Sequence, residues 1–442
     1  MPTESTQIAV LVAVCGSVEP VLVQSLSAAH SRISVTRRVA EVVELCAAAN
    51  AGLGHVAVVS SDLPGLDREV VQSLRAATIA VVGVATTPEA ANWLGQLGVL
   101  HVLTTEQLRK EPKLAIEAIK AAVAAMADAA STDISRASLP VTTSARGRVV
   151  TVWGSTGAPG RTTIAIELAH ALTGISHRSS IRRGFGVRRR TSSPALVRAE
   201  VILVDADTYG SSCATRLGLL DDAAGLALTA LAAREGRLDA STLAAQLVQV
   251  SPRLRLLTGL NRAARWPEVS GDQLELILQR ATELADWTVV DVAHPIEVDE
   301  ILMYDTNAPM RNAATLSALS VADVLVVVGA PDPVGMVRLV QALNALAAAP
   351  IALSAEPIVA VNRVRAAVAG ADPNALVRLA LKRFTSITNP ELIPDDAATA
   401  DAALLAGRTM GKTSRHTAVI PAIKALALRV HQHSGAKSGA KD

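Results

Sequence analysis

The segment that decides the fold extends from Val149 to Leu172 and has the sequence VVTVWGSTGAPGRTTIAIELAHAL. Its first five residues are mainly apolar and β-branched, which is typical of a buried strand. A turn of small residues follows at 154–163, and residues 164–172 have the apolar composition of a buried helix. Backbone N–H groups of such a turn and of the helix N-terminus converge on an anion, so this order predicts a phosphate-binding loop.

The turn departs from the usual GxxxxGK[ST] pattern of phosphate loops. Ser155 stands at the first glycine and Arg161 at the lysine, while Thr162 is placed to bind Mg²⁺. Arginine keeps the charge and can contact two phosphate oxygens, but it is bulkier than lysine. Pro159 removes one N–H donor from the turn. The alternative interpretation is a glycine-rich connection without a ligand.

Polar side chains end three later apolar segments. Asp205 and Asp207 close the segment VILVDAD, Asp291 closes TVVD, and Asn362 closes VAVN. At the carboxyl edge of a parallel sheet such acids orient water and Mg²⁺, and an amide can contact a purine edge as donor and acceptor at once. These three segments together with the glycine-rich turn, in this chain order, favour a nucleotide site over an empty turn.

The first part of the chain, residues 1–130, alternates between short apolar segments and helical patterns. Five strand–helix steps of this length predict a doubly wound parallel sheet. The expected strands are Ile8–Val14, Ile33–Arg37, His55–Ser60, Ile79–Val84 and Val99–Leu103, and the expected helices are Pro20–Ala29, Ala40–Ala49, Arg68–Ala77, Glu89–Gly98 and about Pro112–Ala130.

This first part resembles a response-regulator receiver domain, chiefly through SSDLPGLD at 60–67. Receivers carry an aspartate where Ser60 stands, an acidic pair after the first strand and a lysine after the fifth. Here the corresponding positions hold residues 13–15 (AVC) and Thr104. Phosphoryl transfer to a receiver needs those acids and that cation. We therefore predict a degenerate receiver used for contacts. Asp62 is a displaced acceptor or, as we prefer, a solvated turn residue.

Residues 131–148 are polar and small and predict a linker, and residues 149–433 predict a second, larger doubly wound parallel α/β domain. Residues 434–442 are expected to form a flexible tail. The strands expected in the second domain are Val149–Trp153, Glu200–Asp205, Leu254–Thr258, Thr288–Val292, Val324–Gly329 and Ile358–Asn362.

Taken together, the chain resembles the ParA/MinD superfamily of P-loop ATPases, and more closely the CpaE/TadZ-type branch associated with septum-site determination and Flp pilus assembly. The resemblance covers nearly the whole chain. It lies in the segments VWGSTGAPGRTT, ILVDADTYG, DEILMYDTNAPMRNAATL, VVVGAPDPVGMVRLV, VNRV and IPDDAATADAALLAGR.

The resemblance implies ATP or ADP and Mg²⁺ as ligands, with Thr162 and Asp291 at the metal. It also implies that Asp207 orients the attacking water and that Asn362 contacts the base. The phosphates would be bound by Ser155, Thr156, Gly157, Ala158, Pro159, Gly160, Arg161, Thr162 and Thr163. A homodimer and protein partners in a polar, pilus-assembly, secretion or division complex are implied as well.

One departure from the superfamily concerns hydrolysis. The signature lysine, which reaches the partner subunit's nucleotide, aligns with Thr156. A cation of this kind is worth roughly 10³–10⁵ in rate, so we expect slow or no hydrolysis. Arg311 is a possible substitute, although a structural ion pair is the preferred interpretation. A non-hydrolysing scaffold with a vestigial site is the alternative function.

Two further segments have open interpretations. Residues 176–198 form an insertion in which the stretch 178–198 contains seven arginines and no acid, which suits DNA phosphates, anionic lipid or an acidic protein, or a solvated insertion without a ligand. DNA binding as in partition proteins is therefore another alternative. The segment 417–433 has helical apolar spacing interrupted by Pro421, and it either packs on the domain or contacts a membrane.

Composition sets outer limits on function. Half of the residues are hydrophobic but only 2% are aromatic, and the net charge is +2, so global charge points to neither nucleic acid nor lipid. The three cysteines lie far apart without metal-ligand spacing, which suits reduced thiols. No signal peptide or transmembrane segment is expected, and we predict a cytoplasmic protein, peripheral at a membrane, pole or septum if its partners lie there.

Overall fold

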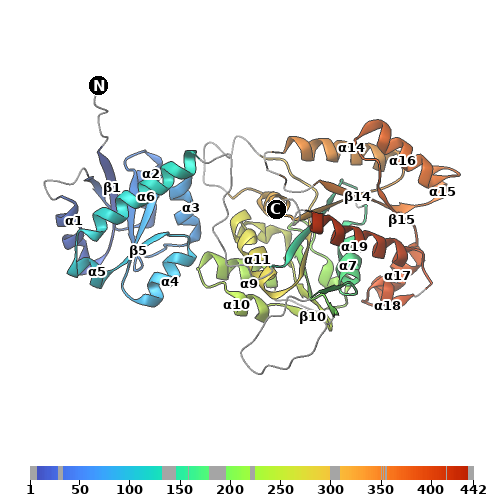
Figure 1. The fold of residues 1–442 in the computed structure, drawn as a ribbon, viewed down its shortest axis with the longest axis horizontal. Coiled ribbons are helices and arrows are strands. Elements are labelled where there is room, and N and C mark those ends of the chain that lie inside the picture. The colour runs from blue at the N-terminus through green and yellow to red at the C-terminus, as the bar shows by residue number, and fades with distance from the viewer. Residues whose placement is uncertain are drawn as a thin grey trace. The chain divides into compact units, whose positions relative to one another are not determined.

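The structure is a computed structural model that describes residues 7–27, 33–131, 146–157, 159–178, 196–219, 224–298, 309–349, 351, 353, 356–414 and 416–436. The chain divides into two compact units, one of Met1–Thr142 with Ala232–Leu238 and one of Thr143–Leu231 with Asp239–Asp442. Figure 1 shows that strands and helices alternate in both units. The predicted tail beyond residue 436 and most of the predicted linker, at 132–145, lie outside the described residues.

The first unit contains a five-stranded parallel sheet in the order β2-β1-β3-β4-β5. Its strands are β1 (Ile8–Ala13), β2 (Ile33–Arg38), β3 (Val56–Ser60), β4 (Ala80–Ala85) and β5 (His101–Thr104). Its α-helices are α1 (Glu19–Leu26), α2 (Val42–Asn50), α3 (Arg68–Ala76), α4 (Pro88–Gln96), α5 (Thr105–Lys110) and α6 (Leu114–Ser131). Every residue of β3 and β4 is buried. This is the flavodoxin-like strand order, in which the order of the strands reverses between β1 and β3.

At the carboxyl end of this sheet, the two positions compared above with the receiver aspartate and lysine hold the uncharged side chains of Ser60 and Thr104. Ser60 is buried at the end of β3, and its hydroxyl accepts from the Asp62 backbone N–H at 3.2 Å. Thr104, at the position where receivers have lysine, caps α5 and accepts from Gln107 N–H. The short helix α5 was not predicted, and this capping box of Thr104 and Gln107 explains its start.

The second unit contains an eight-stranded sheet in the order β10-β11-β9-β12-β6-β13-β14-β15. The strands are β6 (Arg148–Gly154), β9 (Val201–Ala206), β10 (Val248–Ser251), β11 (Leu254–Leu257), β12 (Trp287–Val292), β13 (Val324–Gly329), β14 (Pro357–Val364) and β15 (Glu391–Pro394). The prediction of two doubly wound, mainly parallel α/β sheets is confirmed. One detail differs: β10 is antiparallel to β11, because two residues between them are too few for a crossover.

The helices of the second unit include α7, which follows β6, and the C-terminal helix α19. They are α7 (Arg161–Leu172), α8 (Cys213–Arg216), α9 (Gly225–Arg234), α10 (Ala240–Ala245), α11 (Gly271–Leu284), α13 (Ala313–Ser320), α14 (Pro333–Ala348), α15 (Ala366–Ala369), α16 (Pro373–Phe384), α17 (Ala397–Leu405), α18 (Met410–Thr413) and α19 (Val419–Ala436). Among the described residues, no helix has the length and apolar character needed to cross a membrane.

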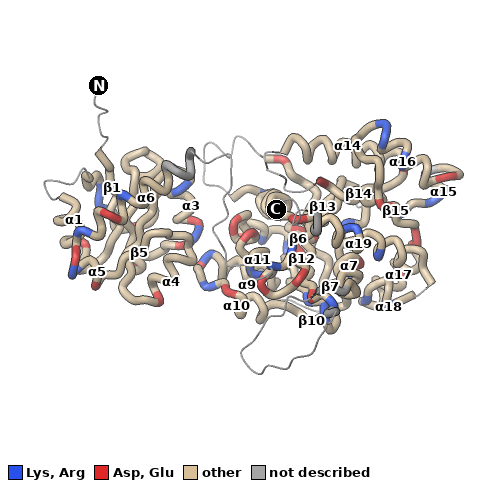
Figure 2. The backbone as a smooth tube through the Cα atoms, in the orientation of Figure 1, with Lys and Arg blue, Asp and Glu red and all other residues tan. Residues whose placement is uncertain are grey.

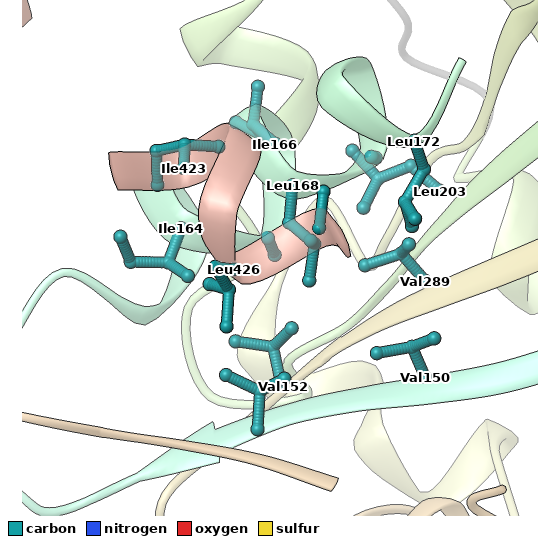
Figure 3. Close-up of a cluster of buried hydrophobic side chains, with 14 of the residues drawn as sticks. Val150, Val152, Ile164, Ile166, Leu168, Leu172, Leu203, Val289, Ile423 and Leu426 are labelled. Carbon is teal, nitrogen blue, oxygen red and sulfur yellow. The ribbon is translucent and has the colours of Figure 1, made fainter. Parts of the chain in front are cut away.

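The core of this unit lies between the central strands, α7 and α19. Figure 3 shows Ile164 and Leu168 of α7 in one buried cluster with Val152 of β6 and Leu426 of α19. Of the two interpretations of segment 417–433, packing on the domain is the one observed, since the apolar side chains of α19 that face the core are at most 5% exposed. Pro421 falls in the first turn of α19, where proline costs no hydrogen bond, and so it does not interrupt the helix.

The arginine-rich insertion enters and leaves the fold through a two-stranded antiparallel ribbon, β7 (Ser176–Arg178) and β8 (Leu196–Arg198). Residues 179–195, which hold most of its arginines, lie outside the described residues. Along the described chain, basic and acidic residues are interspersed in both units (Figure 2).

Candidate functional site

The connection between β6 and α7 has the geometry of a tight anion-binding turn. Gly157 and Gly160 have φ of +91° and +98°, values that favour glycine, and Gly160 is the N-cap of α7. Ser155 is buried, and its backbone N–H donates to the Val328 carbonyl of β13 at 3.2 Å. The first residues of α7 therefore present free backbone donors at a helix N-terminus. Ala158, another predicted phosphate contact, lies outside the described residues.

Asn362 of β14 supports this turn. Its side-chain N–H donates to the Pro159 carbonyl at 2.9 Å, and the residue is only 8% exposed. A methyl group on Gly160 would lie 2.4 Å from Asn362 Nδ2, so the two segments are in close contact. Asn362 thus holds the loop from β14, the second strand from β6 in the sheet, and its predicted contact with a base remains a prediction.

Arg161 lies across the loop. Its Nη1 donates to the Ser155 carbonyl at 3.0 Å, and its Nη2 is 4.0 Å from Asp207 Oδ2. The two charged side chains are only 14% and 12% exposed. Among the described residues no group accepts from Arg161 Nε or bonds to the Ser155 hydroxyl, although both atoms are buried. The loop therefore contains a cation and a hydroxyl with bonding capacity left for an anion.

Two buried aspartates meet next to the loop at the carboxyl ends of β9 and β12, where Asp205 and Asp291 pair in register. The Thr162 hydroxyl bonds to Asp291, and one oxygen of each aspartate has no hydrogen-bond partner in the described structure. Burial raises the pKa of both carboxyl groups. Charge repulsion from Asp207 raises the pKa of Asp205 further, and repulsion from Asp205 and Asp207 raises that of Asp291. Unpaired carboxylate oxygens beside a threonine hydroxyl form a donor set that fits Mg²⁺.

Cys213, for which no role was predicted, lies in the same cluster. Its thiol sulfur is 3.8 Å from Asp291 Oδ2, and its backbone N–H donates to Asp205 Oδ2 at 2.9 Å. Burial raises the pKa of the Cys213 thiol, and both aspartates raise it further. The thiol therefore stays protonated and donates to Asp291, so Cys213 shapes the acidic cluster without offering a thiolate ligand. No spacing along the chain indicates this contact, because 78 residues separate the pair.

Asp207 is held in a fixed orientation at the open side of the cluster. Its Oδ1 accepts from the backbone N–H groups of Tyr209 and Gly210, both at 2.9 Å, and its other oxygen faces Arg161. A carboxylate fixed by two donors keeps lone pairs free to accept from water. The arrangement suits the predicted role of orienting a water molecule.

Arg311, the possible substitute cation, is held by neutral groups. It donates to the Thr208 hydroxyl and carbonyl at 3.0 and 3.1 Å, and its guanidinium carbon lies 3.5 Å from the centre of the Tyr209 ring. No carboxylate pairs with it among the described residues, so the preferred structural ion pair is replaced by hydrogen bonds and a cation–π contact.

A cleft of about 390 Å³ opens beside the loop. It is lined by Thr163 of α7, by Asn362, Arg363 and Arg365 at the end of β14, and by 394–396 after β15, among others. Arg363 has φ of +61°, a strained value that non-glycine residues adopt mainly at functional sites. Of these residues, sequence reasoning identified only Thr163 and Asn362 as site residues. Residues 394–396 were missed because the short strand β15 was not predicted, whereas Arg363 and Arg365 lie at the end of the predicted strand β14 without a pattern that indicates a site.

Sequence reasoning also missed Arg338 of α14, whose guanidinium lies next to the loop at Gly157. A methyl group built on Gly157 would lie 2.3 Å from Arg338 Nη1 and 3.4 Å from its Cζ. The pair is far apart in sequence, and nothing in the helical pattern around Arg338 distinguishes it from an ordinary solvated arginine.

Comparison with known proteins finds similarity to solved structures alone. No protein-family description matches the sequence, and no curated protein is similar to it at a significant level. Among solved structures it is similar to a ParA family ATPase from Chlorobium tepidum, with 19% identity, a TM-score of 0.45, and coverage of 64% of this chain and 98% of that one.

It is also similar to the septum site-determining protein MinD, complexed with Mg-ADP, from Pyrococcus horikoshii, with 16% identity, a TM-score of 0.47, and coverage of 67% and 100%. A further similar structure is the MinC:MinD cell division protein complex from Aquifex aeolicus, with 17% identity, a TM-score of 0.45, and coverage of 65% of this chain and 96% of that one. A likeness at this level carries no information on ligands, so the chemistry of this chain follows from its own residues.

Proposed function

We propose that the second unit binds ATP or ADP with Mg²⁺ and serves as a nucleotide-dependent localisation factor that hydrolyses ATP slowly or not at all. The observation that carries this proposal is the convergence of unpartnered buried groups on one turn. The Ser155 hydroxyl, Arg161 Nε and one oxygen each of Asp205 and Asp291 are buried and have no hydrogen-bond partner among the described residues. Buried polar atoms without partners are rare, and groups of both signs side by side suit a metal–phosphate ligand.

Each residue has a defined task in this proposal. The backbone at 155–163 and Arg161 bind phosphates, Thr162 and Asp291 hold Mg²⁺, and Asp207 orients water. Bound Mg²⁺ would supply neutralising charge to the phosphate oxygens. The cleft beside Asn362 would hold the base and ribose. Its mixture of arginines, acids and an amide offers donors and acceptors to a polar heterocycle.

Slow hydrolysis is part of the proposal because Thr156 offers a hydroxyl where a cation would stabilise the transition state. The neighbouring cations Arg161 and Arg311 already have partners within the fold. We further propose, from the resemblance in sequence, a CpaE/TadZ-like role in a polar, pilus, secretion or division complex. In that role the protein forms a homodimer, and the first unit is a degenerate receiver that contacts partners.

The competing function is a scaffold that no longer binds nucleotide. It is favoured by the Arg161 contacts, since a phosphate must compete with the Ser155 carbonyl and Asp207 for this guanidinium. Titration of the purified full chain with ATP and ADP, with and without Mg²⁺, separates the two. We expect Mg²⁺-dependent binding and phosphate release on the order of 10⁻³ s⁻¹ or slower, as in P-loop proteins without a positioned arginine. Absence of binding with Mg²⁺ present would leave only the scaffold.

The metal site gives a sharper test. Thr162→Ala removes a proposed Mg²⁺ ligand, and we expect Mg²⁺-dependent ATP affinity to fall at least about 10-fold, while binding measured in EDTA stays the same. Thr173→Ala, at the other end of α7, is the matched control and should bind like the wild type. Its hydroxyl donates only to the local His170 carbonyl. Equal Mg²⁺ dependence in the Thr162 variant and the wild type would remove Thr162 from the metal site.

A further inference from the structure

The start of α14 is fixed next to the phosphate loop. The helix follows β13, the strand that pairs with β6, and its N-cap Asp332 accepts from Gly335 N–H at 2.9 Å. Leu339 is fully buried and lies against Gly329, where an added methyl group would be 2.5 Å from its side chain. These contacts set the position of Arg338, the preceding residue, whose side chain is exposed and reaches the loop at Gly157.

The rim of the loop lacks a charge of its own at this point. Thr156 and Gly157 are both exposed, and neither side chain carries a charge. Three other arginines around the loop already donate within the fold: Arg161 to the Ser155 carbonyl, Arg311 to Thr208, and Arg216 to the Thr163 hydroxyl at 3.3 Å. In the described part of the chain no acceptor or carboxylate pairs with the Arg338 guanidinium, so its five N–H donors remain available.

We propose that Arg338 binds the outermost phosphate of a nucleoside triphosphate from within the same chain, and so supplies the positive charge that Thr156 does not. This inference rests on the proposed nucleotide function. A guanidinium bonds to phosphate with two parallel N–H groups, and the terminal phosphate of ATP offers charge at the exposed rim that ADP lacks there. Arg338 therefore makes the site selective for ATP over ADP and links the nucleotide state to α14.

The test compares the affinities of the full chain for ATP and ADP, with Mg²⁺, by displacement of a fluorescent nucleotide. Loss of a charge-assisted bond predicts that Arg338→Gln weakens ATP binding about 10-fold or more and changes ADP binding little, so the ratio of the two affinities collapses. Arg338→Lys keeps the positive charge but loses the two parallel N–H donors of the guanidinium. Its ratio of ATP to ADP affinity should lie between those of the wild type and Arg338→Gln. Arg378→Gln, an exposed arginine of α16, is the matched control and should keep the wild-type ratio.

A second variant separates charge from structure. Thr156→Lys combined with Arg338→Gln should recover preference for ATP, because it moves the cation to the loop itself. Thermal unfolding should be unchanged in each variant, as the side chain is exposed. If the wild type binds both nucleotides and Arg338→Gln keeps their ratio, this inference is wrong while the proposed function stands. If the wild type binds neither nucleotide, the proposed function fails and this inference with it.

Discussion

Replacing Gly160 by alanine is expected to weaken nucleotide binding roughly 30-fold or more. Gly160 has φ of +98°, a conformation that costs a residue with a side chain about 1–2 kcal/mol. The new methyl group would also lie 2.4 Å from Asn362 Nδ2, which must then give up its bond to the Pro159 carbonyl. A lost buried hydrogen bond adds about 1–3 kcal/mol.

Binding of a fluorescent nucleotide measures this effect, and circular dichroism checks that the variant is folded. Gly210→Ala is the matched control, because Gly210 lies at the same site with no atom within 4 Å of an added methyl group. Its backbone N–H, which donates to Asp207, is retained. Equal affinity of a folded Gly160 variant and the wild type would show that the turn does not hold the ligand.

Replacing Glu167 by glutamine is expected to stabilise the second unit at pH 8. Glu167 of α7 is 4% exposed, and burial raises its pKa from 4.5 to about 7 against the opposing effect of the Met410 and Gly411 N–H groups. An acid with a raised pKa binds its proton more tightly in the folded state. The stability that the protonated Glu167 contributes to the folded state is therefore fully present below pH 4.5, and it is lost as the pH rises through about 7.

The size of this effect follows from the shift of the pKa. The neutral amide avoids the cost of a buried charge and can still accept from Met410 N–H, so the free energy of unfolding at pH 8 should rise by up to roughly 3 kcal/mol. At pH 4.5 the two proteins should be equally stable. Urea unfolding at both pH values measures the difference, with the exposed Glu356→Gln as control.

His170 lies one turn further along α7, and burial followed by the nearby Lys412 lowers its pKa. The contribution of His170 to the free energy of unfolding is lost as the pH falls, whereas that of Glu167 is lost as the pH rises. Because His170 is present in both proteins, the difference between wild type and Glu167→Gln reports on the carboxyl group. A Glu167→Gln protein that is less stable than the wild type at pH 8 would show that the site holds a charged carboxylate.

The fold could be predicted where local signals suffice. The segment 149–172 has strand, turn and helix patterns that agree with one another, and β6 and α7 form there. The short elements β10, β15 and α5 were missed because none of them has more than two valine, leucine or isoleucine residues. The equally short β11 has three leucines and was predicted.

The residues of the candidate site likewise fall into a group that local sequence patterns predict and a group that they do not. The loop residues and Asp207, Asp291 and Asn362 follow strand ends, where parallel sheets gather polar groups, and the structure brings them to one edge. Cys213 and Arg338 reach the site through tertiary packing alone. Neither residue stands in a pattern that distinguishes a site from a core thiol or a solvated helix face, so their part could not be inferred before the fold was known.

The proline in the loop has an entropic consequence. Pro159 has its φ fixed by its ring, and its carbonyl is held by Asn362 of β14. Ordering one flexible residue costs about 1–2 kcal/mol of conformational free energy. At this position that cost is met when the chain folds and not again when a ligand arrives. The residue that deprives the loop of one hydrogen-bond donor therefore also keeps it in a single shape, ready for its ligand.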